Sequence, residues 1–114
     1  YGPGVTAAST SGYGRGTTAP DIQVGNTSLG FHEGRHGLDF VQFLTTHPFP
    51  QFTGTTGMTV GDFEQAMQAY IAARQQFNND MDSFSESSTD CVGTTIDQHN
   101  ASNGIHTTIC QQVP

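Results

Sequence analysis

The chain has 114 residues, a length typical of one domain, and carries ten Asp and Glu residues against three basic residues, all Arg, for a formal net charge of -7. This balance excludes nucleic acid as an expected partner, because that affinity depends on basic side chains that neutralise phosphates. It also argues against an anionic membrane surface, and no apolar run approaches the roughly 20 residues that span a bilayer. The chain begins at Tyr1, so we expect a processed product or a domain excised from a longer protein.

The N-terminal part shows no helical periodicity. Residues 1–19 are rich in Gly, Ser, Thr and Ala, which predicts an irregular or extended arm that could include a strand at 5–8. Residues 20–25 alternate polar with apolar side chains between a proline and a glycine, a pattern that favours a short edge strand. In a zinc peptidase such a strand can pair with an extended substrate. An ordinary packed strand is the alternative.

A first helix is expected from Leu29 to about Thr45. Residues 26–28 are Asn, Thr and Ser, which are good N-caps, and Pro48 disfavours helical backbone at the residue before it. Three glycines at 30, 34 and 37 interrupt this helix at about 1 kcal/mol each relative to Ala. Such a cost suggests that another backbone packs closely against this helix.

A second, longer helix is expected after Thr59, which resembles an N-cap with Asp62 in the first turn. Apolar residues recur along it at steps of three and four, apart from one gap at Arg74, and form a stripe for packing against another helix. The stripe consists of Phe63, Met67, Tyr70, Phe77, Met81 and Phe84. Residues 85–89 are polar, so we expect the helix to end there in a loop.

The C-terminal tail holds both cysteines, Cys91 and Cys110. A disulfide between them would restrict the unfolded chain by about 3 kcal/mol and would indicate an oxidising compartment. Thr95 and Gln98 match a capping box, and Gly104 suits a helix stop, which predicts a short helix over about 96–103. The alternative is a hairpin that turns at residues 103–104 between strands at 92–97 and 105–110.

The first predicted helix carries the pattern His-Glu-x-x-His at His32, Glu33 and His36. Two histidines four residues apart lie on one face of a helix, where both imidazoles can reach a single metal ion. The glutamate beside them can accept a proton from a water molecule at that metal. This chemistry is typical of zinc hydrolases. The alternative is a pair of exposed histidines without a ligand.

A catalytic zinc site needs a third protein ligand. We expect His99, whose neighbour Asp97 could orient the imidazole or ligate in its place. Glu64, on the second helix, lies at a distance that resembles the gluzincin pattern, and His106 and His47 remain as alternatives. The extended metzincin pattern is absent, because Asp39 and Gln42 occupy its positions.

The motif resembles that of small zincin-like metallopeptidase domains, in particular bacterial secreted or periplasmic proteins that pair the His-Glu-x-x-His helix with a later segment containing Asp, Thr and His. The resemblance covers about residues 22–100, with 90–100 as the later segment and His99 as the matching histidine. The chain departs from the pattern at Asn100, where the family has Gly. Similar motifs occur in toxin domains released from larger bacterial effectors.

These observations predict a small helix-rich α+β domain over residues 1–114, with two long helices, a short N-terminal strand element and a disulfide-stapled tail. The expected function is a secreted or periplasmic zinc metallopeptidase in which His32, His36 and His99 bind Zn2+ and Glu33 is the general base. Tyr70, His106 or Arg35 could stabilise the oxyanion. Expected partners are a protein or peptide substrate and, for a toxin, an inhibitor or immunity protein, with no nucleic acid and no membrane. The alternatives are a non-catalytic, metal-stabilised binding or structural module and a metal-free exported domain.

Overall fold

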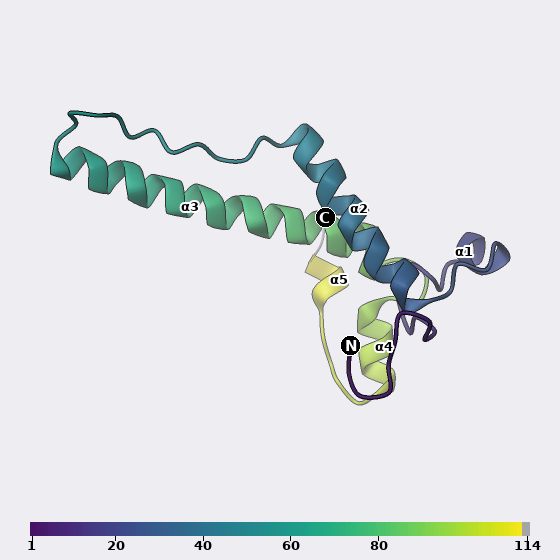
Figure 1. The fold of residues 1–114 in the computed structure, drawn as a ribbon. Coiled ribbons are helices and arrows are strands. Elements are labelled where there is room, and N and C mark those ends of the chain that lie inside the picture. Colours follow the sequence, from purple (N-terminus) through teal and green to yellow (C-terminus); the bar gives the residue numbers. More distant parts are fainter. Residues whose placement is uncertain (113–114) are drawn as a thin grey trace.

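The computed structural model describes residues 1–112, which form helices and irregular segments. In chain order the helical elements are α1 (Ala19–Gln23), α2 (Leu29–Thr46), α3 (Val60–Ser85), the π-helical turn η1 (Glu86–Asp90), α4 (Ile96–Ser102) and α5 (Ile109–Gln112). Figure 1 shows α3 projecting as a rod from one end of the molecule, where the other helices and the N-terminal arm gather. Within the described range, no helix is both long and apolar enough to cross a membrane.

The expected α+β class is wrong, because no strand forms within residues 1–112. Residues 20–25, expected as an edge strand, lie mostly in α1. The Thr18 hydroxyl caps this helix by accepting a hydrogen bond from the Asp21 N–H at 3.3 Å, and Pro20 lies in the first turn, where its missing N–H is not needed. Residues 1–18 are turns and irregular backbone, and their pairing with the rest of the chain includes one isolated antiparallel bridge between Thr10 and Ser28.

Helix α2 begins and ends close to the predicted residues. The Ser28 hydroxyl accepts a hydrogen bond from the Phe31 N–H at 3.1 Å, which confirms the expected N-cap. Two further N–H groups of the first turn, which a helix leaves unpaired, donate to carbonyls of the arm: Leu29 to Ser9 at 2.6 Å and Gly30 to Ala7 at 2.8 Å. The arm therefore supplies hydrogen-bond acceptors to the first turn of α2.

The glycines of α2 have different surroundings. A Cβ at Gly30 would lie 3.0 Å from the Cβ and the carbonyl oxygen of Ala7, which confirms that another backbone packs closely there. At Gly34 and Gly37 a Cβ would meet nothing within 4 Å, so the expected close packing is wrong for these two positions. They lie on exposed parts of the helix.

Helix α3 is the longest element, with 26 residues, and the Thr59 hydroxyl caps it at the Asp62 N–H. Its C-terminal half packs against α2 through aromatic rings. Phe43 and Phe77 are the buried apolar residues of the described chain, and their ring centroids lie 5.3 Å apart in a T-shaped contact. The polar segment after Ser85 was expected to be a loop, but it continues the helix axis as η1.

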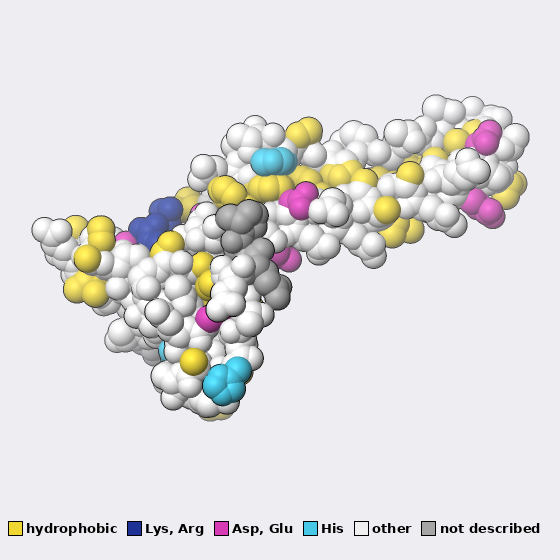
Figure 2. Space-filling model, turned by 180° about the vertical axis from the view of Figure 1, so that it is seen from behind, with side chains coloured by type: hydrophobic (Ala, Val, Ile, Leu, Met, Phe, Trp, Pro, Cys, Tyr) yellow, Lys and Arg dark blue, Asp and Glu magenta, His cyan; other side chains and the backbone are white. Residues whose placement is uncertain are grey.

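The N-terminal half of α3 extends away from this small core. The radius of gyration is 18.8 Å, well above the roughly 13 Å of a compact chain of this length. The segment that follows α2 runs back beside α3 in Figure 1, and the Phe52 ring contacts the rings of Phe63 and Tyr70. Figure 2 shows hydrophobic side chains at the surface along this rod, where Phe52 and Phe63 are exposed.

The tail is held by its predicted crosslink. Cys91 and Cys110 form a disulfide with their Cα atoms 5.3 Å apart, and the capping box of Thr95 and Gln98 starts α4. The hairpin alternative for this segment is therefore wrong. The Asp97 carboxylate accepts hydrogen bonds from the backbone N–H groups at 109 and 110, both at 3.0 Å, and so fixes the segment that carries Cys110.

Candidate metal centre

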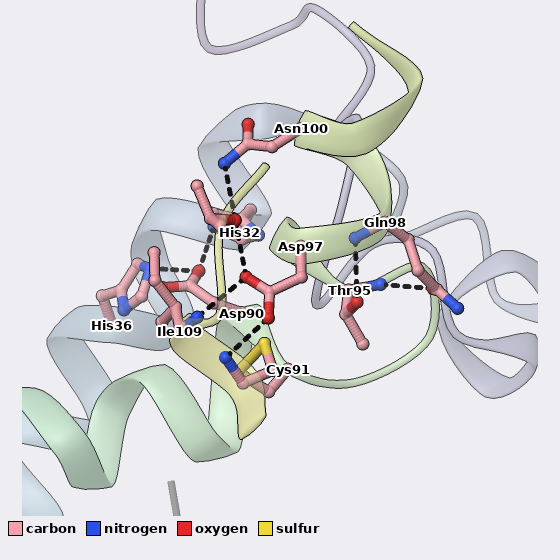
Figure 3. Close-up of a disulfide and its surroundings, with 11 residues drawn as sticks. His32, His36, Asp90, Cys91, Thr95, Asp97, Gln98, Asn100 and Ile109 are labelled. Carbon is pink, nitrogen blue, oxygen red and sulfur yellow. Dashed lines mark hydrogen bonds and ion pairs between the residues drawn. A yellow bond between two sulfur atoms is a disulfide. The ribbon is translucent and has the colours of Figure 1, made fainter. Parts of the chain in front are cut away.

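Three side chains from α2 and η1 meet at the junction with the arm. His32 and His36 lie one turn apart on α2 and point toward Asp90, the last residue of η1 (Figure 3). The Nε2 atoms of both histidines lie 3.1 Å from Asp90 Oδ1, and the three potential ligand atoms are all within 4.8 Å of one another. His32 is 1% exposed and Asp90 is buried, whereas His36 is partly open to solvent.

The second nitrogen of His32 identifies its tautomer. Nδ1 lies 3.0 Å from the backbone carbonyl oxygen of Arg15, which can only accept a hydrogen bond. Nδ1 therefore carries the proton, and the neutral ring presents a lone pair at Nε2. This nitrogen is buried and faces Asp90 Oδ1 at 3.1 Å.

The same reasoning applies to His36 through a longer chain of hydrogen bonds. Its Nδ1 lies 2.6 Å from the Ser85 hydroxyl, which donates to Asp39 Oδ2 at 3.2 Å. Because the Ser85 hydroxyl donates its hydrogen to Asp39, its oxygen accepts a hydrogen bond from the N–H at His36 Nδ1. Thr89 also donates to Asp39 Oδ2, at 2.6 Å, so a buried carboxylate fixes this arrangement. In this tautomer His36 Nε2, which lies 3.1 Å from Asp90 Oδ1, presents a lone pair.

With both rings neutral and protonated at Nδ1, three acceptor atoms converge, and a proton on either Nε2 would instead be shared with Asp90 Oδ1. A single proton could join Asp90 to only one of the two nitrogens, and protonating both would leave two imidazolium ions beside one carboxylate. A cation satisfies all three acceptors at once. The two 3.1 Å distances are close to the roughly 3.3 Å edge of a tetrahedron of zinc ligands with bonds of about 2.0–2.1 Å. His32, His36 and Asp90 could therefore hold a metal ion.

The charges around this group favour positive charge. Burial alone would lower the pKa of His32, but the Asp90 carboxylate and the Arg15 carbonyl outweigh it and raise that pKa. The pKa of His36 is raised mainly by Asp90. Burial by itself would raise the pKa of Asp90, yet the two imidazoles lower it. Asp90 is thus ionised at neutral pH and available as a ligand.

The N-terminal arm is fastened beside these residues. Arg15 and Asp21 form a bidentate pair with distances of 2.9 and 2.7 Å, and the Gly16 N–H donates to the same carboxylate at 2.9 Å. The hydrogen bond to Arg15 is the main cause of the lowered pKa of Asp21. The Arg15 N–H in turn donates to the Thr89 carbonyl at 2.7 Å. These bonds hold the Arg15 carbonyl oxygen within hydrogen-bond distance of His32 Nδ1.

The arm also covers one side of the group. Gly14 has a positive φ of 64°, and a Cβ there would collide with the Thr89 carbonyl, so the backbone approach requires glycine. The Tyr13 ring meets His32 edge to face with centroids 5.0 Å apart. Burial, followed by the charges of Asp90 and Glu33, raises the pKa of Tyr13. The phenol is therefore neutral.

Glu33, the expected general base, is exposed on α2 next to His32. Its charge contributes to the raised pKa values of both histidines and of Tyr13, which places it within electrostatic reach of the site. The sequence-based role of Glu33 stays a prediction.

The structure places the other predicted ligands outside this group. The His99 ring packs on Tyr13, with centroids 5.3 Å apart, and does not join His32 and His36. The Asp97 carboxylate accepts hydrogen bonds from the backbone of the tail. Glu64 lies near the start of α3, 21 residues from its end and thus about 30 Å away along the helix. His47 stacks on Phe43 at the end of α2, and His106 is exposed in the tail.

The residues predicted to stabilise an oxyanion also differ in their distance from the histidines. Tyr70 packs on Phe52 far along α3, which leaves it away from the histidines. Arg35 lies on α2 and has a buried Nε without a hydrogen-bond partner in the described chain.

Asp90 is the candidate ligand that sequence reasoning missed. It marked the start of the later segment at 90–100, but it was not weighed as a ligand. The π-helical turn carries its side chain around to face α2, and such turns frequently occur at functional sites. The available signal was the unusual run of polar residues directly after an amphipathic helix.

Comparison of the chain with protein-family models, curated proteins and solved structures found no match. The resemblance to zincin-like domains therefore stays a prediction from the sequence motif.

Proposed function

We propose that the chain is a zinc-dependent peptidase with His32, His36 and Asp90 as metal ligands. The observation that supports it best is that potential ligand atoms of His32, His36 and Asp90 lie within 4.8 Å of one another, while the Nδ1 atoms of both rings contact the Arg15 carbonyl and the Ser85 hydroxyl. Two imidazoles and one carboxylate form a donor set typical of catalytic zinc sites, which have three protein ligands and an open position. When bound, Zn2+ lowers the pKa of a water ligand toward neutrality and polarises a carbonyl group.

The residues of the chain have separate tasks in this proposal. Arg15 and Ser85 fix the two imidazoles through their Nδ1 atoms, and this orientation increases both the basicity and the rigidity of the ligands. Glu33 accepts a proton from the attacking water and transfers it to the leaving amine. Its exposure on the solvent side of α2 leaves it accessible to substrate.

The second candidate is a non-catalytic module in which a metal ion only joins α2, η1 and, through Arg15, the arm. This second function is supported by the position of His32, His36 and Asp90, which connect α2 with η1 in a chain that has few buried apolar residues within its described part. For either function we propose an oxidising compartment outside the cytosol, because the Cys91–Cys110 disulfide is of the kind that persists there.

Glu33→Gln discriminates between the two functions. In the peptidase, this variant should keep one zinc ion per chain and lose at least about a hundredfold in peptide cleavage, the usual contribution of a general base. Glu64→Gln, which removes an exposed charge from the far end of α3, is the control and should cleave normally. Cleavage by Glu33→Gln at the rate of the unmodified chain would refute the peptidase proposal.

A further inference from the structure

A pocket of about 190 Å³ adjoins the candidate metal centre. Residues of α2, the last turn of α3 and η1 line it, namely His36, Phe40, Asp82, Ser85, Glu86 and Asp90. At about 30 Å³ per water molecule, this volume corresponds to about six waters and thus to the room needed by one long amino-acid side chain. It is smaller than the roughly 300–1,000 Å³ of pockets for whole small molecules.

The pocket begins at the atoms that would bind the metal. His36 and Asp90 belong both to the candidate metal centre and to the pocket lining, and His32 Nε2 lies 3.1 Å from Asp90 Oδ1. A substrate bond placed at the centre would therefore have the pocket beside it. This position suits a side chain adjacent to the bond that is cleaved.

The lining combines negative charge with one aromatic wall. Asp82 and Glu86 make no side-chain hydrogen bond or ion pair within the described residues, and no basic side chain other than His36 lines the pocket. Burial, followed by the charges of Asp90 and Asp82, raises the pKa of Glu86, and the charge of His36 offsets only part of this shift. The Phe40 ring, stacked 6.4 Å from His36, supplies an apolar surface.

We propose that this pocket binds the side chain of a lysine or arginine residue next to the cleaved peptide bond, so that the substrates are basic peptides. The inference rests on the proposed peptidase function for the position of that bond. The alkyl stem lies along Phe40, and the ammonium or guanidinium group faces Asp82 and Glu86, where charge-assisted hydrogen bonds form. The net charge of -7 also attracts basic substrates over longer distances.

Binding is measured first, without cleavage. Zinc-loaded Glu33→Gln protein is titrated by NMR with the blocked peptides acetyl-Ala-Ala-Xaa-Ala-Ala-amide, where Xaa is lysine, arginine, norleucine or glutamate. We expect lysine and arginine to bind about tenfold more tightly than norleucine, the size of one hydrogen bond to a charged group. Adding Glu86→Gln should reduce this ratio to below about threefold, whereas adding Glu64→Gln, the matched control, should leave it unchanged.

The same titration of the metal-free protein tests whether the pocket binds lysine without the metal. The ratio of the affinities for the lysine and norleucine peptides should persist when zinc is absent. Equal binding of lysine and norleucine overturns the inference. So does a ratio that Glu86→Gln leaves unchanged. Saturable binding of Ca2+ that Glu86→Gln abolishes and that displaces the lysine peptide would assign the pocket to a divalent cation and overturn it as well.

Cleavage of the four peptides by the unmodified, zinc-loaded chain distinguishes this inference from the proposed function. Cleavage with equal kcat/KM for lysine and norleucine leaves the peptidase proposal standing and refutes the pocket assignment. Selective binding of lysine without any cleavage refutes the peptidase proposal and supports the cation pocket. Selective binding together with selective cleavage supports both.

Discussion

Ser85→Ala is expected to weaken metal binding although Ser85 is not a ligand. The Ser85 hydroxyl is 2% exposed, accepts from His36 Nδ1 at 2.6 Å and donates to Asp39 at 3.2 Å. Its removal leaves the His36 N–H without its acceptor and the buried Asp39 carboxylate with only the Thr89 donor of the two hydroxyls. The imidazole then loses the hydrogen bond that fixes its orientation and its tautomer.

Partners of this kind affect metal affinity by about 10- to 100-fold. At about 1.4 kcal/mol per factor of ten, this corresponds to about 1.4–2.8 kcal/mol of binding free energy. The metal-free variant should also lose about 1–3 kcal/mol in free energy of unfolding, because the buried Asp39 carboxylate loses a hydrogen bond. Competition with a zinc-chelating dye measures the first quantity, and urea denaturation of the metal-free protein measures the second.

Ser83→Ala is the matched control, because Ser83 is exposed on the same turn of α3. It should keep the zinc affinity of the unmodified chain within about twofold. If Ser85→Ala also kept its zinc affinity within about twofold, the hydrogen-bond chain from Asp39 to His36 would not orient a ligand, and the tautomer argument for His36 would be refuted.

Two further predictions concern the segments that frame the site. Replacing Cys91 and Cys110 by Ala should lower the free energy of unfolding by about 3 kcal/mol, because the crosslink closes a loop with a sequence separation of 19. Urea denaturation measures this loss, and an unchanged unfolding midpoint would contradict the prediction. The Arg15–Asp21 pair should make the free energy of unfolding fall in acid. The pKa of Asp21 is lowered in the folded state, so the stabilisation from this carboxylate is complete above its unfolded pKa of about 4 and decreases as the pH falls below that value. Urea denaturation between pH 7 and 3 should show a smaller decrease for Asp21→Asn than for the unmodified chain, and parallel curves would contradict the assignment.

Local signals in the sequence were sufficient for most helices. Ser28, Thr59 and Thr95 were recognised as N-caps because capping needs only residues within one turn, and α2, α3 and α4 begin after them. The segment at 20–25 was misjudged, because six alternating residues are weak evidence, and the cap at Thr18 together with the bidentate contact of Asp21 to Arg15 favours a helical turn. Thr18 and Arg15 both lie outside the segment 20–25.

The metal centre was only partly predictable for the same reason. His32 and His36 share a helix face through local geometry, which a five-residue pattern contains. The approach of Asp90 depends on how α3 packs on α2 and on the π-helical turn that follows, and both are tertiary features. The neighbouring Asp97 and the family resemblance favoured His99 as the third ligand, but the structure packs that ring against Tyr13.

The assignment of the centre is tested most directly by the zinc affinity of Asp90→Ala and His99→Ala, measured side by side with the unmodified chain. The unmodified chain should bind one zinc ion, His99→Ala should bind it with similar affinity, and Asp90→Ala should lose at least about a hundredfold, because two histidines alone do not complete a catalytic site. Loss of zinc in His99→Ala with full retention in Asp90→Ala would contradict the centre described here, and so would a chain that binds no zinc at all.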